Sequence, residues 1–182
     1  MNNHAAKRPV EQALYESGLN FTVLQPAMFM QTLLNGWKEV EERSTFSLPY
    51  SKKAKACYVD YRDVAETAAI AFTNTNLDYG TFELCSAGMV DRIELTELMS
   101  RALGRPIQAC EPSFEEWAQK AQIPAGAVRD GLRKMYDDYN QFGFPGGNAL
   151  VLRAILDREP RTLSSFFAEL ASGGGGRSKS AA

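Results

Sequence analysis

The stretch that decides the fold is ESGLNFTVLQPAMFM, residues 16–30. Gly18 stands where a helix C-cap belongs, so the apolar spacing before it predicts a helix over residues 7–16. Residues 21–24 are aromatic and β-branched, and the Gln-Pro pair after them predicts a strand that is buried on both faces and stopped by proline. Open α/β sheets bind ligands at the carboxyl ends of such strands. Spacing alone favours core packing of residues 28–30, and a ligand site at this strand end is the alternative.

Helices and strands keep alternating beyond this stretch. Helical spacing returns over residues 28–43, and residues 64–72 are strongly helical, with either Asp60 or Asp63 as the N-cap. This alternation predicts an α/β layer architecture with mostly parallel strands, which we assign to residues 1–111. The remaining elements of this part are predicted as strands at 46–49, 56–59, 81–85 and 106–111, and as a helix at 94–103.

Strands and helices alternate up to residue 111, and from Pro112 onward the sequence pattern is helical. This change predicts a helical lobe over residues 112–171. Ser113 has the form of an N-cap, and Glu116 three residues later completes a capping box. The last stretch, residues 172–182, contains four consecutive glycines and predicts a flexible tail. Further helices of the lobe are predicted at 126–139, 149–156 and 163–170.

The composition is that of an ordinary globular protein. Of the 182 residues, 45% are hydrophobic and 23% are charged, and the formal net charge is −2. This charge balance predicts neither a nucleic-acid partner nor a membrane partner. The longest apolar stretch, residues 21–37, is interrupted by polar residues and does not have the form of a membrane span. The N-terminal residues lack the apolar region of a signal peptide, so we expect a cytoplasmic protein.

Few residues have the spacing of a catalytic or metal site. His4 is the single histidine of the sequence, so we expect neither a Ser/His/Asp triad nor a zinc site. The three cysteines, Cys57, Cys85 and Cys110, lie far apart without a metal-binding spacing. We therefore expect them to be buried, reduced thiols.

Several short motifs occur in a fixed order along the chain. His4 and Lys7 form an H-x-x-K pair ahead of the decisive stretch, whose SGLNFTVLQPAMFM core follows at residues 17–30. In this order and spacing the motifs resemble the NmrA-like family of atypical short-chain dehydrogenases/reductases, over residues 4–170. The later matching motifs are VDYRDVAE at 59–66, YGTFEL at 79–84, ELTEL at 94–98, ALGRPI at 102–107 and REPRTL at 158–163.

The resemblance implies a Rossmann-type, NAD(P)-binding parallel sheet with a C-terminal substrate lobe. Lys7 falls on the family's lysine, which contacts the nicotinamide ribose in active members, and it is the candidate catalytic residue. An ammonium group at this position can donate hydrogen bonds to ribose hydroxyls. The family segment that passes the nicotinamide corresponds to Pro26, Ala27, Met28 and Phe29. The candidate substrate-pocket residues are Trp37, Tyr136 and Tyr139, with packing as their alternative role.

The chain departs from the family pattern in two ways. The tyrosine of the Y-x-x-x-K pair is replaced by Asn3, which has no phenolic proton to give. The glycine-rich turn that holds the pyrophosphate belongs well upstream of Lys7, and the glycine clusters at 143–147 and 173–176 do not follow a predicted strand. The chain thus resembles the C-terminal half of the family, in which residues 21–24 become an exposed, hydrophobic sheet edge.

Three functions remain open on this reading. The first is a truncated NAD(P)-binding protein that binds NAD or NADP weakly or not at all. The second is an NAD(P)-dependent oxidoreductase completed by a partner chain that supplies the glycine-rich half. The third is a non-enzymatic redox-sensing or protein-interaction module, which uses the exposed sheet edge to bind a partner or a second copy.

Overall fold

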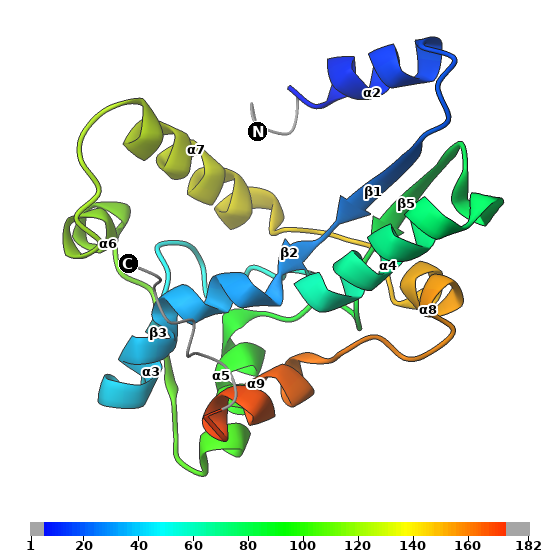
Figure 1. Ribbon diagram of the computed structural model, residues 1–182. Helices are drawn as coiled ribbons and strands as arrows, with labels where there is room; N and C mark the ends of the chain where they lie inside the picture. The colour runs from blue at the N-terminus through cyan, green and yellow to red at the C-terminus, as the bar shows by residue number, and fades with distance from the viewer. Residues whose placement is uncertain (1–5, 174–182) are drawn as a thin grey trace, which may run out of the picture.

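The computed structural model describes residues 6–173, in which helices alternate with short parallel strands (Figure 1). The predicted α/β class with parallel pairing is confirmed. Asn3, His4 and most of the predicted tail lie outside the described residues. In chain order the elements are α2 (Arg8–Glu16), β1 (Thr22–Pro26), β2 (Met28–Phe29), η1 (Met30–Gly36), α3 (Trp37–Arg43), β3 (Thr45–Ser47), β4 (Tyr58–Val59), α4 (Tyr61–Thr73), η2 (Thr75–Leu77), β5 (Gly80–Leu84), α5 (Arg92–Leu103), β6 (Gln108–Cys110), α6 (Phe114–Lys120), α7 (Ala127–Phe142), α8 (Leu150–Leu156) and α9 (Leu163–Ala171).

The strands of the described residues form three two-stranded parallel sheets, and one interrupted strand, residues 22–29, contributes to two of them. Its first part, β1, pairs in parallel with β5 over its whole length. At Ala27 the backbone changes partner, because the Ala27 N–H donates to the Leu84 carbonyl (2.9 Å) whereas the Met28 N–H donates to the Cys57 carbonyl (3.2 Å). β2 then pairs with β4, and β3 pairs with β6, again in parallel. The partner change puts residues 26–29 at the boundary between two strand pairs.

The helix predicted over residues 28–43 is wrong in its first half. The first two residues form β2, the next seven form the 3₁₀ helix η1, and only the remainder, α3, is α-helical. Pairing with β4 keeps the first two residues extended, which local apolar spacing does not reveal. A Cβ atom at Gly36 would lie 2.4 Å from the Phe46 ring, so the end of η1 packs closely against β3.

Local polar residues start several helices. Asp60 rather than Asp63 caps α4, since its side chain accepts a hydrogen bond from the Arg62 N–H (2.9 Å). Asp63 is fully buried and accepts hydrogen bonds from the segment before α9. The capping box predicted at Ser113 and Glu116 is confirmed at the start of α6.

The helices after residue 112 occupy two different places. α8 packs on α4 and β5, and α9 packs on α5. Trp37 in α3 stacks on Phe167 in α9, with ring centroids 5.9 Å apart and an interplanar angle of 8°. α6 and α7 lie on the opposite side of the molecule from α8 (Figure 1). None of the helices in residues 6–173 has the length and apolar character needed to cross a bilayer.

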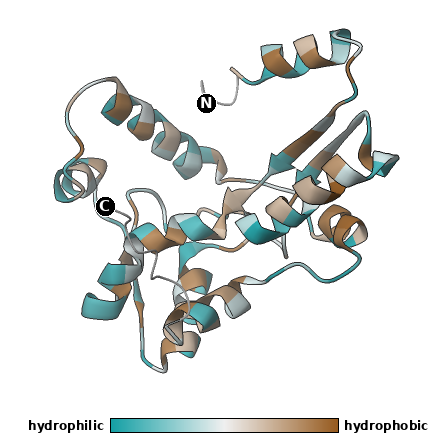
Figure 2. Ribbon diagram, viewed as in Figure 1, coloured by the Kyte–Doolittle hydropathy of each residue, from teal (hydrophilic) through white to brown (hydrophobic). Residues whose placement is uncertain are grey.

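β1 has a free edge. Among the described residues it pairs only with β5, which confirms the predicted exposed edge. Its residues are mostly half-buried, so the prediction of burial on both faces is wrong. Helix α2 lies at the periphery of the molecule (Figures 1 and 2). It buries none of its residues and carries apolar positions such as Val10, which is 68% exposed. A sheet edge and a helix face are thus both uncovered on this side.

The prediction of reduced thiols is wrong for two of the three cysteines. Cys57 and Cys85 form a disulfide with a Cα–Cα distance of 6.5 Å, and neither is exposed to solvent. Cys57 immediately precedes β4, and Cys85 immediately follows β5. The arrangement of these two strands therefore brings together two cysteines that are 28 positions apart in the chain. Cys110 is free and half-buried. Within residues 6–173 no group of three or more metal-ligating side chains is placed to hold a metal ion.

Candidate functional site

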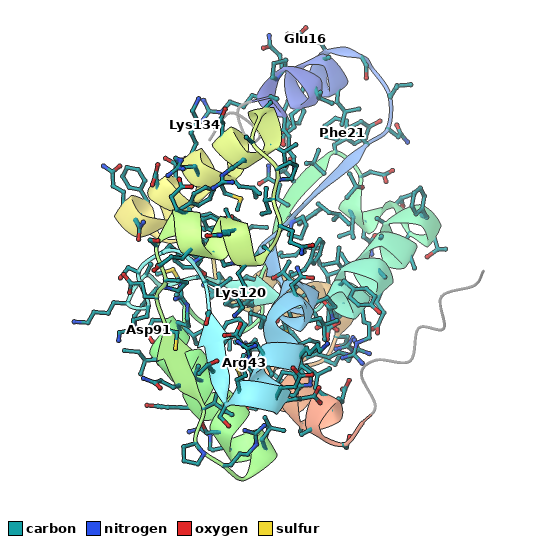
Figure 3. The ribbon with its side chains drawn as sticks, turned by 90° about the vertical axis from the view of Figure 1, so that its left-hand side faces the viewer. Glu16, Phe21, Arg43, Asp91, Lys120 and Lys134 are labelled. Carbon is teal, nitrogen blue, oxygen red and sulfur yellow. A yellow bond between two sulfur atoms is a disulfide. The ribbon has the colours of Figure 1, made fainter. Side chains whose placement is uncertain are left out.

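A cavity of about 820 Å³ opens between the α3–β3 side of the sheet and the helices α6 and α7. Met28 of β2 and Tyr58 of β4, which face each other across the strand pair, both line it. The cavity therefore lies at the carboxyl end of the decisive strand, where open α/β sheets place their ligands. Figure 3 looks onto this side of the molecule, with Arg43 of α3 and Lys120 of α6 labelled.

One side of the cavity, the aromatic wall, consists of Tyr50, Trp117, Tyr136 and Tyr139. Tyr50 and Tyr136 are stacked, with ring centroids 5.6 Å apart and an interplanar angle of 18°. The Trp117 ring meets Tyr136 edge to face at 5.1 Å, and Tyr139 meets Tyr50 in the same way at 5.5 Å. Such contacts hold the ring positions.

Burial keeps the tyrosines of the cavity protonated. It raises the pKa of Tyr136 and of Tyr139 to about 12, and it raises the pKa of Tyr58 as well. A raised phenol pKa means that the neutral form persists through the physiological range. These hydroxyls can therefore donate as well as accept hydrogen bonds, and none of the three contributes a negative charge to the cavity at neutral pH.

The opposite side of the cavity is polar and is centred on Glu39. Its carboxylate accepts hydrogen bonds from the Lys120 ammonium (2.7 Å) and from the hydroxyls of Thr45 (2.9 Å) and Ser47 (2.8 Å). Burial alone would raise the pKa of Glu39, but these hydrogen bonds outweigh it and hold the pKa below its usual value. One carboxylate thus connects α3, β3 and α6 across the cavity.

The pairing of Glu39 with Lys120 predicts an acid-sensitive attachment of α6. Because the pKa of Glu39 is lowered in the folded state, its contribution to stability is present above the usual pKa of 4.5 and is lost as the pH falls through the folded value. Glu39→Gln is expected to lower the free energy of unfolding by about 1 kcal/mol at pH 7. It is also expected to speed amide exchange in α6, measured by mass spectrometry.

Glu42→Gln is the matched control for this substitution. Glu42 lies on the same helix and pairs with Lys38 at 3.8 Å, but both side chains are exposed. We expect no change in the exchange of α6. Equal exchange rates in the two variants at pH 7 would contradict the attachment.

A buried arginine, Arg92, lies beneath the aromatic wall and was not predicted. Its guanidinium carbon is 4.5 Å from the Tyr50 ring centroid. Its Nη atoms donate to the carbonyls of Leu48 (2.9 Å), Tyr50 (2.7 Å) and Cys110 (2.6 Å). Arg92 thereby holds the 48–50 segment against the end of β6 and positions Tyr50. In the sequence it precedes the helix predicted over residues 94–103, and no local signal marks it as buried.

The structure brings together only part of the predicted site. Tyr136 and Tyr139 line the cavity with Met28, beside the half-buried Pro26 and the buried Ala27. Phe29 is 37% exposed at the end of β2. Trp37 instead lies in the core. Sequence reasoning also missed Tyr50, Glu39, Trp117 and Lys120, whose partners are distant in the chain.

Lys7 lies apart from this cluster. It is an exposed residue at the start of α2, and no hydrogen bond or ion pair within residues 6–173 joins its side chain to residues 26–29. The helix itself reaches the sheet through Tyr15, which hydrogen-bonds with Thr81 (2.9 Å). The structure therefore does not place Lys7 beside residues 26–29, where β1 ends.

The described residues do not fit a dinucleotide pyrophosphate. Such a group needs a glycine-rich turn between a strand and a helix N-terminus. The turn after β1 contains no glycine. The glycines near Gly143 serve close packing instead, since an added Cβ at Gly143 would lie 2.3 Å from the Lys55 carbonyl oxygen, and one at Gly146 would lie 2.7 Å from the Cys57 Cβ. The backbone at these glycines thus lies against the protein itself.

Comparisons with known proteins agree with this architecture. The crystal structure of an NADPH-dependent quinone oxidoreductase from Escherichia coli in complex with NADPH matches with a TM-score of 0.74 at 17% identity, over 88% of this chain and 56% of that chain. This likeness shows that the chain has a Rossmann-like fold.

Two curated relatives match parts of the sequence. The NAD(P)H azoreductase of Xenophilus azovorans is 27% identical over 129 residues, which are 69% of this chain and 44% of the relative. The (4-alkanoyl-5-oxo-2,5-dihydrofuran-3-yl)methyl phosphate reductase of Streptomyces griseus is 31% identical over 130 residues, 71% of this chain and 42% of the relative. The chain therefore spans less than half the length of these relatives. The NmrA-like family model matches residues 1–167, and the chain belongs to that family.

Proposed function

We propose that the chain is the substrate-binding half of an NAD(P)-dependent reductase, which a partner polypeptide completes. The observation that carries this proposal is the cavity at the carboxyl end of β2, next to residues 26–29. The azoreductase and the quinone oxidoreductase, both named as NADPH- or NAD(P)H-dependent, support a reductase. In the completed protein, residues 26–29 pass the nicotinamide and Lys7 contacts its ribose as the candidate catalytic lysine.

The free edge of β1 supports the need for a partner. An unpaired strand edge presents backbone groups that another strand can bind. The uncovered apolar face of α2 lies on the same side. A partner that adds a parallel strand to β1 and covers α2 would also bring the glycine-rich turn that the described residues lack. Without it, the chain binds NAD or NADP weakly or not at all.

Isothermal titration tests this proposal. We expect no saturable binding of NADPH or NADH to the chain alone below about 100 μM. Co-expression with the upstream part of the Xenophilus azoreductase, the part that precedes the matched region, is expected to give a co-purifying pair that binds NADPH. The upstream part alone is the control. Low-micromolar NADPH binding by the isolated chain would refute the proposal.

A second candidate function, a non-enzymatic interaction module, is favoured by the same uncovered edge. In this case the edge of β1 and the apolar face of α2 together join two copies of the chain, and no dinucleotide is needed. Sedimentation velocity distinguishes the two: a self-associating chain whose dimer is abolished by Val10→Glu supports the module, and a monomer at about 100 μM argues against it.

A further inference from the structure

The disulfide lies where the strand formed by β1 and β2 changes its partner. The Ala27 N–H donates to the Leu84 carbonyl (2.9 Å), and the next N–H, that of Met28, donates to the Cys57 carbonyl (3.2 Å). Cys57 and Cys85 lie beside this change, one directly before β4 and the other directly after β5. Their bond is therefore a cross-link between the β1–β5 pair and the β2–β4 pair.

Backbone hydrogen bonds hold the two cysteines close together without the S–S bond. The Ser86 N–H donates to the Tyr58 carbonyl (2.9 Å), so the residues that follow Cys85 and Cys57 are joined directly. These contacts keep the Cα atoms of the two cysteines 6.5 Å apart, within the range that a disulfide bridges. The two sulfur atoms therefore remain neighbours after reduction, and the bond can form again without refolding of the chain.

The same site also accommodates two thiols. The Cys57 Sγ lies 3.9 Å from the Gly147 carbonyl oxygen, and the Cys85 Sγ lies 3.8 Å from the Tyr58 carbonyl oxygen. A thiol S–H is a weak donor, and both oxygens are within its reach. Each sulfur thus has an acceptor in the reduced state, so burial leaves neither thiol without a partner. The surroundings of the pair suit both of its oxidation states.

Residues 144–147 lie against Cys57 and contain two glycines. An added Cβ at Gly146 would lie 3.1 Å from the Cys57 Sγ, so no side chain separates this backbone from the sulfur. The segment is attached by the Gly147 N–H, which donates to the Glu83 carboxylate (3.0 Å), and by the backbone of Phe144. A small reductant reaches the sulfur when this segment moves away together with the end of α7. We expect such an opening to be rare and reduction to be slow.

We propose that Cys57 and Cys85 are a reversible redox site, at which oxidation fixes and reduction loosens the junction between the two strand pairs. In reduction, a thiolate of a dithiol reductant attacks the Cys57 sulfur, the S–S bond breaks, and the Cys85 sulfur leaves as a thiolate that takes up a proton. The second thiolate of the reductant then releases Cys57, which is protonated in turn, and closes a disulfide within the reductant. Oxidation by a small-molecule disulfide runs the same exchange in reverse.

Residues 26–29 are the segment that this site controls, because they cross the junction that the disulfide spans. In the oxidised chain both of their strand partners are tied to each other. In the reduced chain only hydrogen bonds join the two pairs, and the pairs can separate locally. The proposal concerns the folded chain alone and does not rest on the proposed reductase function.

A cycle of reduction and oxidation at pH 7 tests the reversibility. Cys110→Ala is the chain used, because the free Cys110 would itself form mixed disulfides. We expect about 10 mM dithiothreitol to give the dithiol form and glutathione disulfide to restore the cross-link, both read from the mass after acid quenching and alkylation. Circular dichroism is expected to remain that of a folded chain throughout.

Three outcomes of this cycle would overturn the proposal. A pair that dithiothreitol reduces only in urea is a permanent cross-link. A pair that glutathione disulfide does not join again is a pair of ordinary thiols. Unfolding on reduction would mean that the dithiol form is not a native state.

Amide exchange, measured by mass spectrometry, shows what the site controls. On reduction we expect peptides that contain residues 27–28 and 84–86 to exchange at least about fivefold faster, whereas residues 95–99 of α5, in the other core cluster, keep their rates. The double variant Cys57→Ser with Cys85→Ser places hydroxyl donors at both positions, so we expect the fast rates with and without reductant. Equal rates at the junction in the oxidised and reduced chain with both cysteines would overturn the control of residues 26–29.

Discussion

Replacing Cys57 and Cys85 together by alanine is expected to lower the free energy of unfolding by about 3.5 kcal/mol. The disulfide closes a loop between residues 28 positions apart, and a cross-link of that span removes roughly 3.5 kcal/mol of chain entropy from the unfolded state. Both residues are fully buried between β4 and β5, so exposing them to solvent requires a large opening of the native structure. Urea unfolding at pH 7 measures the difference.

Cys110→Ala is the matched control, since Cys110 is free and half-buried, and we expect a change below about 0.5 kcal/mol. Unfolding of the unmodified chain in the presence of a phosphine reductant is expected to lose the same stability as the double variant, which should itself be insensitive to the reductant. If the reductant leaves the unmodified chain unchanged, the loss in the variant comes from packing and not from the cross-link.

Arg92→Met is expected to cost about 3 kcal/mol and to disorder the aromatic wall. The side chain is 2% exposed, and its removal leaves three carbonyls, those of Leu48, Tyr50 and Cys110, without their donors. Unpartnered buried carbonyls each cost about 1 kcal/mol or more. Burial already lowers the pKa of Arg92, so the native site carries a desolvation penalty that these hydrogen bonds offset.

Arg92→Lys separates the charge from the hydrogen-bond geometry. A lysine ammonium keeps the positive charge but does not present the planar fork of donors, so we expect an intermediate loss of stability. Near-ultraviolet circular dichroism reports the order of Tyr50 and its neighbours. A methionine variant as stable as the unmodified chain, with an unchanged spectrum, would show that the guanidinium does not hold the wall.

The features predicted correctly from the sequence are those encoded within a few residues. The capping box at Ser113 and Glu116, for example, depends on two side chains three positions apart. The choice between Asp60 and Asp63 required the fold, because Asp63 has its partners in the segment before α9. Local chemistry allowed either residue.

The errors arise where distant segments meet. Residues 28–29 follow helical spacing, yet pairing with β4 makes them a strand. The disulfide joins Cys57 and Cys85 only because β4 reaches β2 on one side and the continuation of β5 on the other. The cavity combines α3, β3, α6 and α7, and its buried arginine is held by carbonyls far from it in sequence. The hydrophobic periodicity of a single helix or strand carries no information about such contacts.

Hydrogen bonds outside the cavity attach both ends of the α6–α7 segment to the part of the chain that carries the strands. On one side the Lys52 N–H donates to the Glu111 carboxylate (2.9 Å). On the other, the Phe144 N–H donates to the Lys55 carbonyl (2.9 Å), and the Phe144 carbonyl accepts from the Cys57 N–H (3.0 Å). Residues 112–143 are therefore an exchangeable module: a different pair of helices can be grafted between these anchors, and ligand preference can diverge while the strands stay as they are.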